Sequence, residues 1–326
     1  MSNGIGKVTT FNSLSEIGTP VRLDSNEGIF FERELEVIRE QVFEEGKPML
    51  NFLEVLPVKS DLPDWAAEYT YRWSNESGKA GYIGNGADDF PVVGVGMSEA
   101  SERVRMIGAA VEFTAMDLQR AMISGLSLEQ SLFRTARRAI ETKINEIAWY
   151  GDASQRLRGL LRHPEIMVQP VSNAIGGSAS ADNVLAELNA CVNDMLNNTE
   201  QVEAPTDLLL PPDSYQYAAQ QQRSTASDTS TLNFWLATNG YVGPGRAHSI
   251  RELRNATIPA SGGGTTTSDV IVALRRDREV MEFVYSGIKE LPIHRKGAMT
   301  YVVPFYACTA GLAVYKPRAI SIRTGA

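Results

Sequence analysis

Two extended segments that flank a glycine-rich stretch constrain the fold of this chain most strongly. In the first, "AEYTYRWS", Tyr69, Tyr71 and Trp73 alternate with polar residues, which is the period of a half-buried strand. The second covers residues 98–114, and residues 78–93 between them contain four glycines. The pattern predicts one β-hairpin of about 45 residues, and a two-stranded hairpin by itself is at best marginally stable in water. The hairpin therefore has to lie on something else.

A long amphipathic helix is the second constraint. Ser127 and Gln130 form a capping box that opens the segment "LEQSLFRTARRAIETKINEIAWYGD", which spans roughly 35 Å as a helix. On its polar face, Arg137 and Glu141 have the spacing of an i,i+4 ion pair. The strands predicted after residue 278 need a partner, and the apolar side of this helix provides one. That side consists of Leu128, Leu132, Ala136, Ile140, Ile144 and Ile147.

The remaining segments mix helical and strand patterns. Residues 165–275 predict an α/β lobe, in which Asp182 is a suitable N-cap for the helix "NVLAELNACVNDMLNN". "DSYQYAAQQQ" and "TLNFWLAT" predict further helices, whereas "TDLLLPP" and "SDVIVAL" predict buried strands. Upstream of the hairpin, "FFERELEVIREQVFEEG" predicts a helix, and Thr114 with Asp117 predicts a second capping box.

Composition argues against several functional classes. The 326 residues carry a net charge of −8, which argues against affinity for nucleic acid gained by neutralising phosphates. Cys191 and Cys308 lie far apart, so a disulfide scaffold is not expected. The N-terminal sequence lacks the apolar run of a signal peptide, and no segment reaches the roughly 18 apolar residues of a membrane span. We therefore expect a chain without membrane attachment.

Residues capable of catalysis are few and scattered. His163, His248 and His294 have no second histidine at metal-ligand spacing, and a lone histidine is more often structural than catalytic. The glycine-rich pieces at 84–89 and 93–100 lack the third glycine that opens a dinucleotide-binding helix. We therefore expect no catalytic residue and no cofactor.

Two groups of charged residues have both a functional and a structural interpretation. Asp88 and Asp89 would chelate a metal together only in a turn, because adjacent side chains of an extended segment point to opposite faces. We favour an ion pair with a neighbouring base for one aspartate and solvent for the other, without a metal. Arg134, Arg137 and Arg138 of the long helix are interrupted by acidic residues. This favours a solvated face or salt links between subunits over nucleic-acid binding.

The order of these elements resembles that of the major capsid proteins of tailed phages, which have the Hong Kong 97 fold shared with encapsulin nanocompartments. An extended arm precedes a hairpin containing "SGKAGYIGNGADDFPVV", the long helix runs into "RGLLRHPE", and the last strands include "GLAVYKPRAISI". The resemblance implies an α+β, Hong Kong 97-like capsid fold. Its parts would be an N-terminal arm with a short helix (1–55), an E-loop hairpin (56–113), a P-domain with a spine helix (114–164), an α/β A-domain (165–275) and returning P-domain strands (276–326).

The resemblance also implies a structural protein rather than an enzyme. Copies of the chain would self-assemble into pentamers and hexamers of an icosahedral phage head that encloses double-stranded DNA without binding it tightly. The head would be assembled in the bacterial host cytoplasm, and the subunit would reside in the virion. Portal and decoration proteins are further expected partners. Many relatives carry a long scaffolding segment before the arm, whereas here the arm starts almost at once, so we expect scaffolding to be absent or supplied by another chain.

The glycine-rich stretch would be the outer part of the E-loop and would lie on the next subunit, because its glycines let the backbone approach a neighbour closely. One of its two aspartates would meet a base there, for example on the spine helix. Covalent cross-linking through Lys79 is not expected, because no acceptor asparagine can be matched to it. The predicted contact residues are Lys79, Tyr82, Ile83, Asp88, Asp89, Phe90, Val92, Val93, Arg134, Arg137 and Arg138.

Two alternatives stay open at this point. The chain could form an encapsulin shell, which would be recognised by an enzyme cargo in place of a genome inside the particles. It could also be an oligomeric enzyme with a pocket in the 165–275 lobe. Such a pocket needs convergent polar groups with perturbed pKa values, which the sequence alone does not display.

Overall fold

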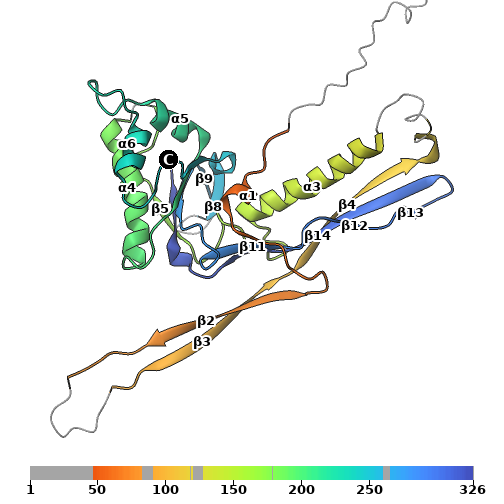
Figure 1. Ribbon diagram of the computed structural model, residues 1–326, viewed down its shortest axis with the longest axis horizontal. Coiled ribbons are helices and arrows are strands. Elements are labelled where there is room, and N and C mark those ends of the chain that lie inside the picture. Colours follow the sequence, from red (N-terminus) through yellow and green to blue (C-terminus); the bar gives the residue numbers. More distant parts are fainter. Residues whose placement is uncertain are drawn as a thin grey trace, which may run out of the picture. The chain divides into compact units, whose positions relative to one another are not determined.

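The computed structural model of the chain describes residues 47–82, 91–117, 119, 128–177, 179–259 and 265–325 (Figure 1). The chain divides into two compact units, residues 1–48 and 49–326, and all elements below belong to the second. The helix predicted in "FFERELEVIREQVFEEG" and the predicted capping residue Ser127 lie outside the described residues.

A six-stranded sheet is built around the long strand β14 (Thr300–Val314). The sequence of this strand, "TYVVPFYACTAGLAV", is rich in β-branched and aromatic residues, which fit a half-buried pleated surface. The other strands are β1 (Val58–Lys59), β4 (Arg105–Thr114), β11 (Met281–Tyr285), β12 (Lys289–Glu290) and β13 (His294–Arg295). β14 pairs antiparallel with β4, β11, β12 and β13, and β1 joins β11 in parallel.

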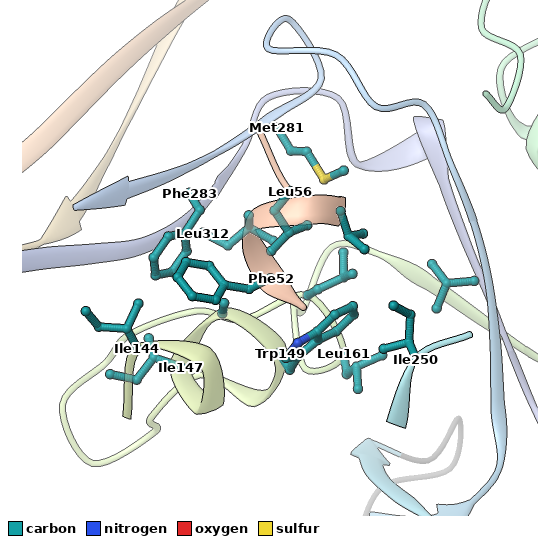
Figure 2. Packing of buried hydrophobic residues seen from close by; sticks show 14 of the residues in the cluster. Phe52, Leu56, Ile144, Ile147, Trp149, Leu161, Ile250, Met281, Phe283 and Leu312 are labelled. Atoms are coloured by element: carbon teal, nitrogen blue, oxygen red, sulfur yellow. The ribbon is translucent and has the colours of Figure 1, made fainter. Parts of the chain in front are cut away.

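The helix α3 (Leu128–Tyr150) packs on one face of this sheet, as predicted. Its predicted apolar side is buried at Ala136, Ile140, Ile144 and Ile147. Ile144 and Ile147 share one core cluster with Phe283 of β11 and Leu312 of β14 (Figure 2). The helix ends at Tyr150, because Gly151 adopts a left-handed φ of 70° that residues with a side chain disfavour.

A one-turn helix, α1 (Phe52–Val55), completes this core and was not predicted. The rings of Phe52 and Phe283 meet edge to face, with centroids 5.6 Å apart (Figure 2). Four residues are too few to display a helical period, so the sequence carries no signal for this element.

An irregularity in β14 changes which of its residues face α3: odd-numbered residues do so before it and even-numbered residues after it. Its pairing with β11 shifts register between Val284 and Tyr285. Gly311 sits at this point with a φ of 78°, and a Cβ there would lie 2.7 Å from the carbonyl oxygen of Arg158. Phe305 and Leu312, which differ in parity, consequently both face α3.

The second sheet of the chain has five strands in the order β5-β15-β10-β6-β7 and forms the centre of an α/β lobe. The strands are β5 (Met167–Pro170), β6 (Asp207–Leu210), β7 (Ala247–Ser249), β10 (Val270–Leu274) and β15 (Ile320–Thr324). The helices are α4 (Ala181–Asn198), α5 (Pro212–Gln220) and α6 (Thr231–Thr238), and β8 (Ala256–Pro259) pairs antiparallel with β9 (Thr265–Ser268). The helices and buried strands predicted in this region are confirmed.

The two predicted caps within the described residues have different outcomes. The backbone N–H and the hydroxyl of Thr114 donate to the Asp117 carboxylate at 3.2 and 2.7 Å, and the Asp117 N–H donates back to the hydroxyl at 3.2 Å, which confirms that capping box. Asp182 is not the N-cap of α4. Ser180 occupies that position and accepts a hydrogen bond from the Asn183 N–H, because its backbone is extended just before the helix begins.

The last strand, β15, does not return to the sheet under α3. It lies in the lobe sheet between β5 and β10. Arg323 of β15 adds two ion pairs with α4: its Nε lies 2.7 Å from Asp194 Oδ2 and its Nη1 pairs with Glu187. The domain boundaries drawn from the sequence remain predictions.

The hairpin is shorter than predicted. β2 (Glu68–Ser77) pairs in antiparallel register with β3 (Gly94–Arg103), which forms the long two-stranded ribbon of Figure 1. Residues 105–114 form β4 and pair with β14 instead. The break falls at Val104, so the extended segment 98–114 belongs half to the hairpin and half to the central sheet.

Candidate interaction surface

One face of the hairpin anchors its base. Tyr69 and Tyr71 of β2 contact Tyr315, which follows β14: the hydroxyls of Tyr69 and Tyr315 are 3.0 Å apart. The rings of Tyr71 and Tyr315 meet edge to face at 4.9 Å, and the Tyr71 hydroxyl donates to the Val314 carbonyl at 3.4 Å. The hairpin base is therefore tied to the end of β14.

The outer half of the hairpin is open to solvent. Met97 is 83% exposed and Val95 is 67% exposed on one face, and Trp73, which lies beyond Tyr71 on the anchored face, is 42% exposed. Arg72 and Glu99 form an ion pair of 3.2 Å beside Met97, and such an exposed pair contributes little to stability. Apolar side chains gathered on an exposed surface indicate a site of protein interaction.

The predicted contact residues of the hairpin tip fall into two groups. Lys79, Tyr82, Val92 and Val93 are exposed. The others, Ile83, Asp88, Asp89 and Phe90, lie outside the described residues. Tyr82, Val92 and Val93 add exposed apolar side chains to those of Val95 and Met97 toward the tip. The contact of all four residues with another subunit remains a prediction.

The predicted arginines of α3 lie on the helix side that is not buried in the core. Arg134 is exposed and Arg138 is half-buried. Arg137 contacts its own subunit: its Nη2 lies 3.9 Å from Glu290 Oε2, and its guanidinium lies 5.8 Å from the Phe305 ring centroid. The pairing predicted along the helix with Glu141 is replaced by this contact to β12, because both side chains reach the same edge of the sheet.

A hollow of about 540 Å³ on the central sheet was not predicted from the sequence. Residues Ile107, Ala109 and Val111 of β4 pack toward α3, so the residues between them point to the opposite face of the sheet. The hollow lies on that opposite face. Its apolar lining includes Met106, Gly108, Ala110, Leu291, Pro304 and Tyr306. Gly108 and Ala110, two small residues on the same face of "RMIGAAVEF", are the sequence signal that could have indicated it.

One acid lies at the rim of this hollow. Asp64 Oδ2 accepts hydrogen bonds from Lys289 Nζ at 2.6 Å and from the Tyr306 hydroxyl at 3.0 Å. The hydrogen bond from Lys289 holds the pKa of the Asp64 carboxyl below its ordinary value. The hollow is therefore an apolar surface with one already paired charge at its edge.

The three histidines have structural surroundings. His163 is buried, and burial together with the charge of Arg158 lowers its pKa to about 4. His248 Nε2 lies 3.0 Å from Asp207 Oδ1 in the lobe, where Thr206 and Arg246 also contact this buried carboxylate. His294 is exposed on β13. The polar groups around Asp207 thus bind each other.

The described residues show neither a metal-binding cluster nor a membrane-spanning helix. Among them, no three or more histidine, cysteine, aspartate or glutamate side chains are grouped as a metal would require. In the same residues, no helix combines the length and the apolar character needed to cross a bilayer.

Comparison with known protein families gives a match over most of the chain. The family model described as major capsid protein matches residues 78–326. A search among curated proteins found no match.

Several solved structures share the fold. The capsid of Myoviridae phage XM1 is 19% identical, with a TM-score of 0.78 over 92% of this chain and 99% of that chain. A structure from Mycobacterium phage Adephagia is 11% identical, with a TM-score of 0.61 over 91% and 98%. The capsid of a native GTA particle is 9% identical, with a TM-score of 0.60 over 89% and 95%. These similarities confirm the predicted α+β fold as one found in phage capsids.

Proposed function

Because this chain belongs to the major capsid protein family, we propose that rings of five and six copies assemble into an icosahedral phage head enclosing double-stranded DNA. Its role is structural, and it resides in the virion. The ring sizes, the enclosed DNA and assembly in the host cytoplasm belong to the proposal. So do scaffolding, portal and decoration proteins as partners.

The main support for this proposal is the distribution of apolar side chains on the hairpin β2–β3. Its base is fastened by Tyr69 and Tyr71, whereas Val95, Met97 and the residues toward the tip expose apolar side chains to water. This distribution is unfavourable for an isolated subunit and favourable for one whose hairpin lies on a neighbour. Contacts of this kind are individually modest, and many of them engaged together produce a stable shell.

The hollow on the central sheet is the surface that we propose receives the hairpin of the next subunit. It lies on the same face of the sheet as Cys308 and Ala310, which the base of the subunit's own hairpin covers. The face is therefore covered by a hairpin near one end and open near the other. A second hairpin would bury Met106 and Ala110 there.

The enclosed DNA is not expected to be held by affinity. A subunit with a net charge of −8 repels a polyanion on average, so packaging has to be driven by other machinery. Titration of the free subunit with duplex DNA at physiological salt should therefore show no submicromolar binding.

Replacement of residues 76–95 by a short Gly-Ser linker tests the role of the hairpin. The deleted part adds little to the core, so the variant should keep its circular dichroism spectrum and its melting curve. Particle counts by electron microscopy should fall to background. Normal particles would refute an assembly role, and loss of the fold would show that the segment belongs to the core of its own subunit.

A further inference from the structure

One strand of the hairpin, β3, joins the central sheet through a single residue. β3 ends at Arg103 and β4 begins at Arg105, with Val104 between them. The Val104 N–H donates to the Ala67 carbonyl at 2.9 Å, which ties the two ends of the hairpin to each other. This bond does not fix the direction of the hairpin relative to the sheet, so other contacts have to set it.

A buried acid lies directly beside this junction. Glu102 of β3 is 4% exposed, and its Oε1 lies 3.1 Å from Arg158 Nη1. The same guanidinium nitrogen lies 3.7 Å from Glu165. Burial raises the pKa of the Glu102 carboxyl and the Arg158 charge opposes this, so the arginine favours the charged form. Among the described residues, this oxygen of Glu102 accepts no well-aligned hydrogen bond, which leaves Arg158 as its close partner.

Arg158 is itself held rigidly by the central sheet. Its carbonyl accepts a hydrogen bond from the Leu312 N–H at 2.9 Å, and its backbone forms a parallel bridge with Gly311. A Cβ on Gly311 would lie 2.7 Å from the Arg158 carbonyl oxygen, so the two backbones pack without space between them. The guanidinium therefore projects from a backbone that is bonded to β14 and reaches a side chain of the hairpin.

We propose that Arg158 is a positioning residue of the hairpin: by holding Glu102 it sets, together with the contacts of Tyr69 and Tyr71 at Tyr315, the direction in which the hairpin leaves the sheet. The significance of that direction rests on the proposed function, because a hairpin that points elsewhere cannot reach the hollow of the next subunit. A second contact, from the segment between α3 and β5 that also contains Arg158, acts on the other side of the junction, where Arg105 Nε donates to the Gln155 carbonyl at 3.3 Å.

Distances between spin labels on the unassembled full-length subunit test the proposal. One label is placed on the hairpin by Met97→Cys and one on the lobe by Val202→Cys, since both positions are highly exposed. The natural cysteines, Cys191 and Cys308, are buried and should not react. With Arg158 present, pulsed dipolar spectroscopy should give one narrow distance distribution.

Two variants remove the contact in different ways. Arg158→Met removes the cation, and Glu102→Gln keeps the shape of the side chain but removes its charge. Each should widen the distance distribution at least twofold, and Arg158→Lys should restore part of the narrow distribution. If circular dichroism shows that Arg158→Met does not fold, the distance distribution of Glu102→Gln alone tests the proposal. Unchanged widths in the variants that fold would overturn the proposal.

Arg72→Met is the matched control, because it breaks an ion pair of similar length on the exposed face of the same hairpin. It should leave the distance distribution unchanged, and equal widening would show that hairpin stability in general sets the distance. The measurement does not depend on assembly. A hairpin that is positioned by Arg158 but plays no part in particle formation would refute the proposed function and leave this inference intact.

Discussion

The hydroxyl of Tyr315 donates to Glu282 Oε2 at 2.9 Å, so the Tyr69 hydroxyl, 3.0 Å away, has to be the donor to Tyr315. A phenol carries only one proton, and this fixes the direction of both bonds. Burial and these two hydrogen bonds raise the pKa of Tyr315 above its ordinary value. The chain of three groups links the hairpin to β11 through the end of β14.

Tyr315→Phe tests this link. The ring and its packing against Tyr71 remain, but Tyr69 loses its acceptor and Glu282 loses its donor. We expect the free energy of unfolding in urea to fall by about 1–3 kcal/mol, because partly buried polar groups are left without a partner. Tyr71→Phe is the control, since it removes only one long hydrogen bond of 3.4 Å and should cost less than about 1 kcal/mol. Equal losses in the two variants would contradict the link.

Gly311→Ala should destabilise the central sheet. The left-handed φ of 78° is strained for alanine, and the new Cβ would meet the Arg158 carbonyl oxygen at 2.7 Å. We expect the free energy of unfolding to fall by roughly 2–4 kcal/mol, measured by urea denaturation. Gly297→Ala is the control, because a Cβ at Gly297 would meet nothing within 4 Å. It should change the free energy of unfolding by less than about 0.5 kcal/mol. A similar small effect at both glycines would disprove the close approach.

The Asp207 carboxylate should make the stability of the lobe sensitive to acid. Burial would raise its pKa, but hydrogen bonds from His248 and Thr206 and the charge of Arg246 outweigh this and lower it. A group whose pKa is lowered on folding stabilises above its unfolded pKa, about 3.9 for aspartate, and this stabilisation is lost as the pH falls further.

The measurement is urea denaturation of the wild type and Asp207→Asn between pH 3 and pH 7. The variant should be less stable at pH 7, and the difference between the two proteins should begin to shrink once the pH falls below the unfolded pKa of about 3.9. A difference that stays constant over this range would show that the charge of Asp207 does not contribute.

The elements with a strong local pattern could be predicted from the sequence. The apolar side of α3, the short buried strand β6 and the helix "TLNFWLAT" each have a period or a boundary that a few neighbouring residues determine. The cap at Thr114 is equally local, because its partner Asp117 lies only three residues away. Such features depend on interactions between residues that are close to each other in the sequence.

Pairing between distant strands could not be predicted in the same way. Alternation shows that residues 98–114 are extended, but it does not say that pairing switches from β2 to β14 at Val104. β15 lies in the lobe sheet through its pairing with β5 and β10, and Arg323 meets two acids of α4 that are more than a hundred residues away. The hollow beside β4 has the same origin, since its residues come from segments joined only by the fold.

Ala110→Asp tests the hollow as the proposed seat of a neighbouring hairpin. Ala110 is exposed on the open face of β4, so a charged side chain can reach water in the free subunit and the melting curve should hardly move. Once a hairpin covers the hollow, the same carboxylate would be buried without a partner, which costs several kcal/mol. Particle yield at equal protein concentration, counted by electron microscopy, should fall at least tenfold, with free subunits accumulating in sedimentation velocity.

Val202→Asp is the matched control, because it adds the same charge at an exposed apolar position of the lobe, away from the hollow. It should assemble like the wild type. If both variants lose particles equally, added negative charge on a subunit already at −8 is the cause and the hollow has no special role. If Ala110→Asp forms normal particles, the hairpin lies elsewhere on its neighbour. Loss confined to Ala110→Asp, with the fold intact, is the outcome that burial of this surface between subunits requires.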